Sequence, residues 1–284
     1  QFPVYFWLAN LVVVPLSTLA LYTGVAALAF SWVPFLSYLA FQSHFWSIWF
    51  MNEFTIRVHQ LPEALINGID ISYAQAWLLY GLMLLIILFL AYKQLRYFAL
   101  ATVVVAALAT QEIQEISAQR NQRNLVVYNM RNATALSFVQ GQQGAVLSDQ
   151  PLAPQNFTFN IQPYLWHKGV PQATQYTFAD TAIPGISHTM LPDSNSLLVW
   201  QGKRVLVLSK RPKMQPKQDF EVDYLLLSQN ARVKPEELQA FRFKQLVLDA
   251  SNAPWYLQRL KPQLAEVGIA FYDVTEQGAL VVEL

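Results

Sequence analysis

The first part of the chain is dominated by long apolar segments that short polar stretches separate. Residues 1–52 contain no Asp, Glu, Lys or Arg. A helix of about 20 apolar residues crosses a hydrocarbon core of about 30 Å. Four segments approach that length, and Pro15 interrupts the first of them: residues 6–29, 30–50, 74–92 and 97–110. We therefore predict an α-helical transmembrane region over residues 1–112.

One stretch inside this region is too polar to span a membrane. Residues 52–73 mix charged side chains such as Glu53 and Arg57 with apolar ones, and Pro62 and Gly68 interrupt the pattern. A segment with both kinds of side chain is typical of the membrane interface. We predict that it is interfacial or re-entrant.

After about residue 112 the pattern changes to short apolar runs typical of β-strands. Residues 113–124 are polar and predict a helical extension or linker. Gly141 and Gly144 mark one hairpin, and Gln201-Gly202-Lys203 marks another. The predicted strands are residues 125–128, 135–139, 145–147, 197–200, 204–208, 224–228, 245–248, 269–274 and 279–284, and the predicted helices are residues 234–240 and 254–267.

Hairpins followed by alternating strands and helices predict a layered α/β domain over residues 125–284. Residues 150–196 are rich in Pro, Gln, Thr and Asn, so we predict a loop or lid there. The fold class is thus an α-helical transmembrane region followed by a soluble α/β domain.

Charge and cysteine content bear on two kinds of function, nucleic-acid binding and cysteine-dependent chemistry. The net charge is +1, so the charge of the chain does not indicate nucleic-acid binding. The mean hydropathy of +0.25 reflects the apolar first half. The chain has no cysteine, which excludes disulfides, thiolate metal sites and a cysteine nucleophile.

Familiar catalytic motifs are missing from the sequence. It contains no phosphate-binding glycine loop, no G-x-S-x-G and no H-E-x-x-H. The two histidines of the second half, His167 and His188, are far apart and more typical of packing or surface residues than of metal ligands. Asp249-Ala250-Ser251-Asn252 follows a predicted strand, where it is either part of a ligand site or an ordinary helix cap.

Two sets of polar residues are candidates for binding. Polar or helix-breaking residues in apolar surroundings are costly in lipid, so they face either protein or a translocation path. They are Asn10, Pro15, His44, Asn52, Arg57 and His59. A basic run in the second half is either a DNA phosphate contact or a solvated loop. It comprises Lys203, Arg204, Lys210, Arg211 and Lys213.

Several segments in both halves match one family pattern. In the first half these are Phe2-Pro3-Val4-Tyr5-Phe6, Leu8-Ala9-Asn10-Leu11-Val12-Val13-Val14-Pro15-Leu16, Leu61-Pro62, Ile69-Asp70-Ile71-Ser72 and Trp77-Leu78-Leu79-Tyr80. In the second half they are Leu125-Val126-Val127-Tyr128-Asn129, Asp223-Tyr224-Leu225-Leu226-Leu227-Ser228, Leu248-Asp249-Ala250-Ser251-Asn252 and Asp273-Val274-Thr275-Glu276-Gln277-Gly278-Ala279. Together they resemble the ComEC family, the inner-membrane DNA-uptake channels of natural competence, in the form found in the Bacteroidetes.

The resemblance implies a metallo-β-lactamase-like C-terminal domain. In the family, metal ligands come from the motifs L-D-V-G-Q-G-D, H-x-H-x-D-H, G-D and H-H-G. Here Tyr128-Asn129-Met130-Arg131-Asn132-Ala133-Thr134 replaces the first, and the second has no counterpart. The third falls near Ser209-Lys210 and the fourth at Gln229-Asn230. The implied domain is degenerate, with no metal, no cofactor and no catalytic residue.

The predicted function is therefore part of a channel for single-stranded DNA in natural transformation, with an inactive C-terminal domain. The expected partners are single-stranded DNA, membrane lipid, other competence proteins and an upstream part of the same chain, since the sequence begins at Gln1 in apolar sequence. Two alternatives stay open: a membrane-bound metal-dependent nuclease or hydrolase, and a membrane-anchored interaction module.

Sidedness is predicted from a few charges. Lys93 and Arg96 lie between two predicted spans, which places that turn in the cytoplasm and the C-terminal domain in the periplasm. Arg120 and Arg123 argue for the opposite orientation. The predicted location is the bacterial inner membrane, with several spans.

Overall fold

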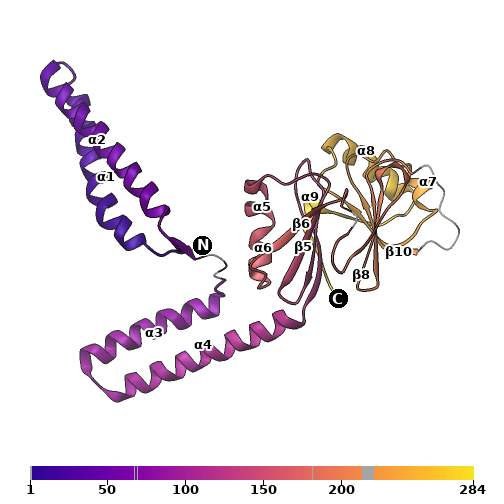
Figure 1. Ribbon diagram of the computed structural model, residues 1–284, viewed down its shortest axis with the longest axis horizontal. Coiled ribbons are helices and arrows are strands. Elements are labelled where there is room, and N and C mark those ends of the chain that lie inside the picture. Colours follow the sequence, from indigo (N-terminus) through magenta and orange to yellow (C-terminus); the bar gives the residue numbers. More distant parts are fainter. Residues whose placement is uncertain (1, 67, 69, 181, 213–220) are drawn as a thin grey trace. The chain divides into compact units, whose positions relative to one another are not determined.

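Two units make up the chain, Gln1–Ile69 and Asp70–Leu284, and each is described by itself. A computed structural model describes residues 2–66, 68, 70–180, 182–212 and 221–284. In Figure 1 the membrane-type helices belong to the first part of the sequence and the sheets to the second.

The first unit is a helical hairpin of α1 (Phe6–Ala29) and α2 (Pro34–His59). Pro34 stands in the first turn of α2, where its missing N–H costs no helical hydrogen bond. Strand β1 (Phe2–Pro3) pairs with β2 (Leu65–Ile66) beside the hairpin. The predicted helix 30–50 thus starts later and runs further, through residues 52–59 of the predicted interfacial stretch. That stretch's place in the membrane stays a prediction.

The second unit begins with another helical hairpin, α3 (Tyr73–Tyr92) and α4 (Leu95–Asn121). Ser72 caps α3 in a capping box with Gln75, which satisfies exposed N–H groups at the start of the helix. The apolar segment 97–110 and the polar stretch after it form one continuous helix, α4. Among the described residues, three helices are long and apolar enough to cross a membrane: α1, α3 and α4.

The remainder of the second unit contains two β-sheets. The five-stranded sheet has the order β13-β3-β4-β5-β6, and the six-stranded sheet has the order β12-β11-β10-β9-β8-β7. The first comprises β3 (Arg123–Val127), β4 (Ala135–Gln140), β5 (Gln143–Ser148), β6 (Ala173–Thr177) and β13 (Leu280–Glu283). The second comprises β7 (Ser187–Met190), β8 (Ser196–Trp200), β9 (Lys203–Leu208), β10 (Glu221–Leu227), β11 (Arg242–Leu248) and β12 (Phe271–Asp273).

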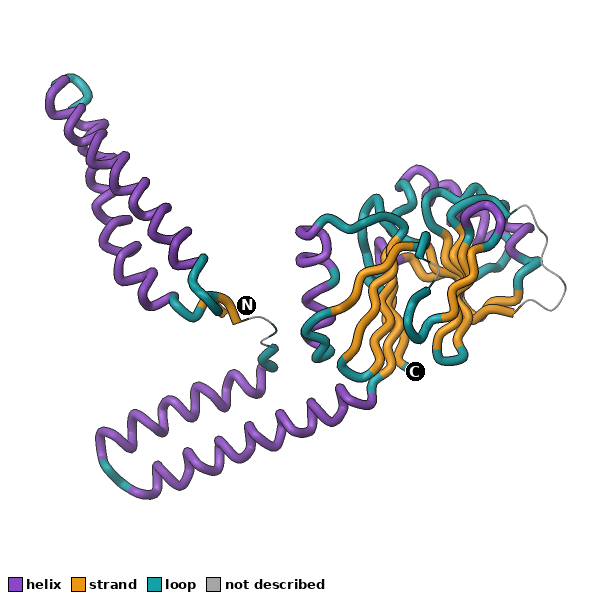
Figure 2. The backbone as a smooth tube through the Cα atoms, in the orientation of Figure 1, coloured by secondary structure: helices purple, strands orange, loops and turns teal. Residues whose placement is uncertain are grey.

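The sheets pack face to face, with short helices on both outer sides (Figure 2). Residues of both sheets, such as Phe138 and Trp200, share one buried cluster. The outer face of the five-stranded sheet packs against α5 (Pro154–Asn160) and α6 (Gln162–His167). The outer face of the six-stranded sheet packs against α7 (Pro235–Leu238) and α8 (Pro254–Glu266). The predicted α/β class is confirmed.

The predicted loop over residues 150–196 is wrong. It contains α5, α6, β6, β7 and a short 3₁₀ helix (Pro192–Ser194). Pro154 and Pro163 lie in the first turns of their helices, where proline starts a helix rather than breaks one. Buried Ile161 and Leu165 anchor these helices on the sheet.

Both predicted hairpins are confirmed, because β4–β5 and β8–β9 are antiparallel neighbours with two-residue turns. Gln201 and Gly202 both have positive φ, +48° and +76°, as a type I′ turn requires. The last two strands are not a pair: β12 and β13 lie in different sheets, and α9 (Val274–Gln277) connects them.

Candidate functional site

Four chain segments meet at one end of the β-sandwich. Thr134 directly precedes β4 and Asp149 directly follows β5, so both belong to the five-stranded sheet. Gln229 lies just after β10, and the Asp249–Ser251 segment follows β11, so these belong to the six-stranded sheet. We call Thr134, Asp149, Gln229, Asp249 and Ser251 the strand-end network.

Asp249 is the centre of this network. Its carboxylate is buried, and Oδ2 accepts hydrogen bonds from Thr134 Oγ1 at 2.7 Å and Ser251 Oγ at 2.6 Å. The other oxygen, Oδ1, is buried without a hydrogen-bond partner among the described residues. The Thr134 bond joins the two sheets, because each partner leaves a different one.

A second branch uses Asp149 and Gln229. Asp149 Oδ1 accepts the backbone N–H of Thr134 at 3.1 Å, and its Oδ2 accepts the side-chain amide of Gln229. The backbone N–H of Gln229 donates to Ser251 Oγ at 3.0 Å. These bonds extend the network from buried Asp249 to the partly buried Asp149 and the exposed Gln229.

Burial changes the acidity of the central carboxyl. Desolvation disfavours the ionised form and raises the pKa of Asp249 to about 6, although the Ser251 and Thr134 hydrogen bonds oppose the rise. Asp249 therefore titrates closer to neutral pH than an ordinary aspartate.

The helix-cap interpretation of Asp249-Ala250-Ser251-Asn252 is wrong. The N-cap of α8 is Ala253, and no side chain caps it. Asn252 instead donates to the carbonyls of Leu227 and Asp249. The segment fixes the loops after β10 and β11 to each other.

The residues present do not fit a divalent metal. Zinc and its relatives need several His, Cys, Asp or Glu side chains that converge. Within the described ranges, no group of three or more such residues could hold an ion. Both ring nitrogens of His188 have hydrogen-bond partners, the Asp180 carbonyl and Ser196 Oγ. Apart from Asp149 and Asp249, the strand-end network consists of hydroxyl and amide side chains, which are poor ligands for zinc.

The structure separates the basic residues predicted to bind phosphate. Lys203 and Arg204 begin β9, whereas Lys210 and Arg211 lie beyond its other end, about 20 Å away at the usual rise of a strand. Arg211 forms an ion pair with Glu237, which raises the pKa of Arg211 and lowers that of Glu237. Lys213 lies outside the described residues.

The polar residues of the first hairpin are dispersed. Asn10 and Pro15 are exposed on α1, and Asn52, Arg57 and His59 are exposed on α2. Arg57 pairs with Glu53 one turn earlier. Helical spacing puts Asn52 and His59 on one side of α2 and Arg57 on another.

His44 differs, because it packs between the two helices. Its Nδ1 lies 2.8 Å from the carbonyl oxygen of Ala20, so Nδ1 carries the proton and donates. A Cβ added at Gly24 would lie 3.1 Å from the His44 ring, which shows how closely the helices approach there. The observed contact of His44 is an interior hydrogen bond, and a role of His44 in a translocation path stays a prediction.

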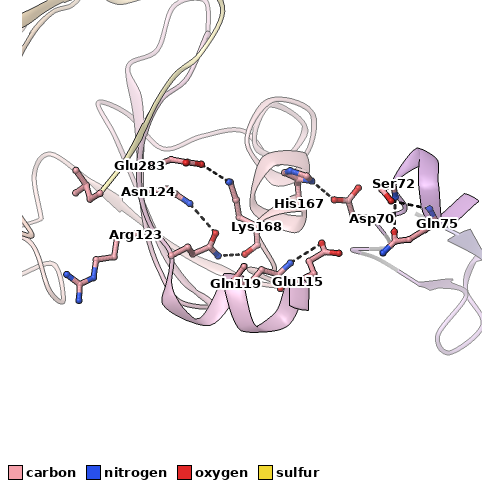
Figure 3. Close-up of a pocket in the computed structure, with 13 residues that line it drawn as sticks. Asp70, Ser72, Gln75, Glu115, Gln119, Arg123, Asn124, His167, Lys168 and Glu283 are labelled. Atoms are coloured by element: carbon pink, nitrogen blue, oxygen red, sulfur yellow. Dashed lines mark hydrogen bonds and ion pairs between the residues drawn. The ribbon is translucent and has the colours of Figure 1, made fainter. Parts of the chain in front are cut away.

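A polar cavity of about 590 Å³ lies where α4 joins the sandwich (Figure 3). Gln122, the single residue between α4 and β3, donates from Nε2 to the carbonyls of Gly141 and Lys168. His167 of α6 contacts Asp70 before α3, and Lys168 pairs with Glu283 at 3.2 Å. Sequence reasoning missed this junction, because no local pattern marks the contacts of Gln122.

Comparison with known proteins assigns both halves of the chain. The model of the ComEC C-terminal domain matches residues 125–284, and the model of the competence protein family matches residues 1–96. No curated protein matches the chain with significant similarity.

Two solved structures are similar to the sandwich. One is a protein from Parabacteroides distasonis whose name describes a putative metal-dependent hydrolase. The two sequences are 12% identical, the match covers 53% of this chain and 93% of that chain, and the TM-score is 0.33. The other is the metallo-β-lactamase fold protein YhfI from Bacillus subtilis. The two sequences are 9% identical, the match covers 57% of this chain and 100% of that chain, and the TM-score is 0.35. Scores this low support no functional inference. The family models carry the assignment: the chain belongs to the ComEC family of competence proteins and has a role in competence for DNA uptake.

Proposed function

We propose that this chain forms part of an inner-membrane channel for single-stranded DNA and crosses the membrane several times. The observation that carries the proposal is the competence match over residues 1–96, which covers α1, α2 and α3. These helices expose long apolar surfaces, as helices in contact with lipid do.

We further propose that the sandwich lies in the periplasm. The α3–α4 hairpin carries Lys93 and Arg96 at its turn, while the opposite end of α4 leads directly into β3. Basic residues favour the cytoplasmic side. A turn in the cytoplasm puts the sandwich on the outer side.

The proposal includes a sandwich without hydrolytic activity. Its support is the strand-end network, which contains Thr134 and Gln229, two residues that the family resemblance puts at metal-ligand positions. Hydroxyl and amide groups neither bind zinc strongly nor generate a hydroxide nucleophile.

Natural transformation tests the main proposal. We expect deletion of the gene in a transformable host to reduce transformation by added DNA to background, and the wild-type gene to restore it. Unchanged transformation after deletion would contradict the proposal.

Two cysteine variants test the orientation. The chain has no cysteine, so Gln201→Cys in the β8–β9 turn and Gln94→Cys in the α3–α4 turn each carry one thiol. A membrane-impermeant thiol reagent on spheroplasts should label Gln201→Cys and spare Gln94→Cys. The reverse pattern would place the sandwich in the cytoplasm.

Metal content and nuclease assays test the inactivity of the sandwich. The purified full chain should hold no stoichiometric zinc or manganese and should leave single-stranded DNA intact. Bound metal together with DNA cleavage would favour the hydrolase alternative.

A further inference from the structure

A second cavity opens between the sheets at the other end of the sandwich. Its volume is about 420 Å³, within the usual range of ligand pockets. It lies at the β4–β5 and β8–β9 hairpins, at the ends of the strands opposite to the strand-end network. We call it the hairpin-end cavity.

The lining of this cavity combines aromatic rings with side-chain amides. Phe138 and Trp200 are almost fully buried and form an edge-to-face pair with centroids 5.5 Å apart. Half-buried Tyr176 adds a third ring. The amides come from Gln140, Gln142, Gln143 and Gln172. None of the described lining residues is charged.

This lining suits a neutral, planar ligand with mixed hydrogen-bonding edges. Tyr176 is the most exposed of the three rings, and aromatic side chains contact the faces of nucleobases. A glutamine amide offers both a donor and an acceptor to a base edge. A lining without charge is poorly suited to an isolated anion or cation.

A lysine that does not line the cavity is the strand partner of one residue that does. Lys203 is directly opposite Trp200 in the antiparallel pair, so both side chains project from the same face of the sheet. Its Nζ is 3.9 Å from Asp223 Oδ1, whereas Lys244 Nζ is 2.6 Å from the same oxygen. Because Lys244 already pairs closely with Asp223, Lys203 can also bind a second anion.

The β4–β5 turn beside the cavity contacts the residue that follows α4. Gly141 lies in the turn between cavity-lining Gln140 and Gln143, and its N–H donates to the Gln122 carbonyl at 2.9 Å. Gln122 directly follows α4. A ligand in the cavity is therefore held on the part of the sandwich that adjoins the membrane hairpin.

We propose that the hairpin-end cavity binds one nucleobase of single-stranded DNA while Lys203 contacts the adjoining phosphate. The inference rests on the proposed DNA-uptake function and adds the place at which the sandwich holds the strand. Aromatic and amide side chains also suit a sugar ring, but the adjacent lysine favours a nucleotide.

The test uses the full chain in detergent and a short fluorescein-labelled oligothymidylate. Fluorescence anisotropy should show that Gln143→Ala with Gln172→Ala weakens binding about tenfold, and that an abasic oligonucleotide of equal length loses a similar factor. Lys203→Gln should weaken binding and lower the salt slope by about 1. Lys234→Gln, an exposed lysine between β10 and α7, is the matched control and should bind like the wild type.

Three outcomes would overturn the inference. They are equal binding by the abasic and base-containing strands, wild-type affinity in the glutamine variant, and displacement of the strand by a neutral oligosaccharide but not by unlabelled DNA. Amide exchange of the β4 and β8 cores, unchanged from wild type, would establish that the variants fold. Loss of transformation on gene deletion together with any of these outcomes would leave the uptake function standing and remove only the cavity's role.

Discussion

Thr134 Oγ1 donates a 2.7 Å hydrogen bond to Oδ2 of the buried Asp249 carboxyl, although the two residues are 115 positions apart. The bond connects the start of β4 to the end of β11, and therefore one sheet to the other. A family resemblance places metal ligands at this end of the sandwich. In this chain, the carboxyls of Asp149 and Asp249, two side-chain hydroxyls and the Gln229 amide connect the strand ends.

Removal of the Thr134 hydroxyl should destabilise the sandwich. Thr134→Val keeps the shape of the side chain but leaves a buried carboxylate with one donor fewer, which costs about 1–3 kcal/mol. Hydrogen exchange of β4 and β11 amides in the full chain should show a loss of this size. Thr134→Ser retains the hydroxyl and serves as the control. Equal protection in the valine variant and the wild type would show that the bond does not hold the sheets.

Asp249 should make the stability of the sandwich depend on pH. Its pKa in the folded chain, about 6, is above the ordinary value of 3.8, so the folded state binds the proton more tightly. The stabilising contribution of that proton is complete below about pH 4 and is lost as the pH rises through about 6, a change of up to about 3 kcal/mol.

Asp249→Asn isolates this effect. Between pH 5 and 7.5, the opening free energy from hydrogen exchange should fall more in the wild type than in the variant, after correction for intrinsic exchange rates. In this range Asp223 and Glu237, whose pKa values are lowered, stay ionised in both proteins. Parallel pH profiles would show that Asp249 does not titrate there.

Two hairpin glycines should differ in their effect on α4. Gly141 and Gly202 both have positive φ, +58° and +76°, so alanine costs about 1–2 kcal/mol at either position. A Cβ at Gly141 would lie 3.1 Å from the carbonyl oxygen of Arg120 in α4, whereas Gly202 has open space.

Gly141→Ala should therefore speed amide exchange at the end of α4, and Gly202→Ala should speed exchange only in its own turn. Mass-spectrometric exchange on peptides that cover residues 115–124 would measure the difference. The same protection in both variants would mean that the β4–β5 turn does not hold α4.

The first hairpin should depend on the small residue at Gly24. Gly24→Leu would displace the His44 ring from the Ala20 carbonyl, and overpacking of this kind costs about 1–3 kcal/mol. We expect a lower thermal midpoint of the chain in detergent. Gly81→Leu in α3 is the control, because nothing lies within 4 Å of its added Cβ. Equal midpoints for the two variants would contradict close α1–α2 packing.

Much of the secondary structure follows from local sequence. Charge-free apolar segments predict membrane helices, and Gly-containing turns between β-type runs predict the two hairpins. The interval 150–196 was predicted wrongly because α5 and α6 are short and depend on the sheet beneath Ile161 and Leu165. Helices of one or two turns are marginal alone, so their local signal is weak.

The sequence by itself determined the membrane character of the first half, the α/β class of the second and the family, since these depend on composition, periodicity and motif residues. Only the tertiary structure decided which polar residues meet. Thr134 lies beside Asp249, and Gln122 lies beside Gly141 and Lys168, while Lys203 and Lys210 lie at opposite ends of β9. The physical reason is that these contacts arise when distant strands pair and stack, and no local periodicity records which strand ends become neighbours.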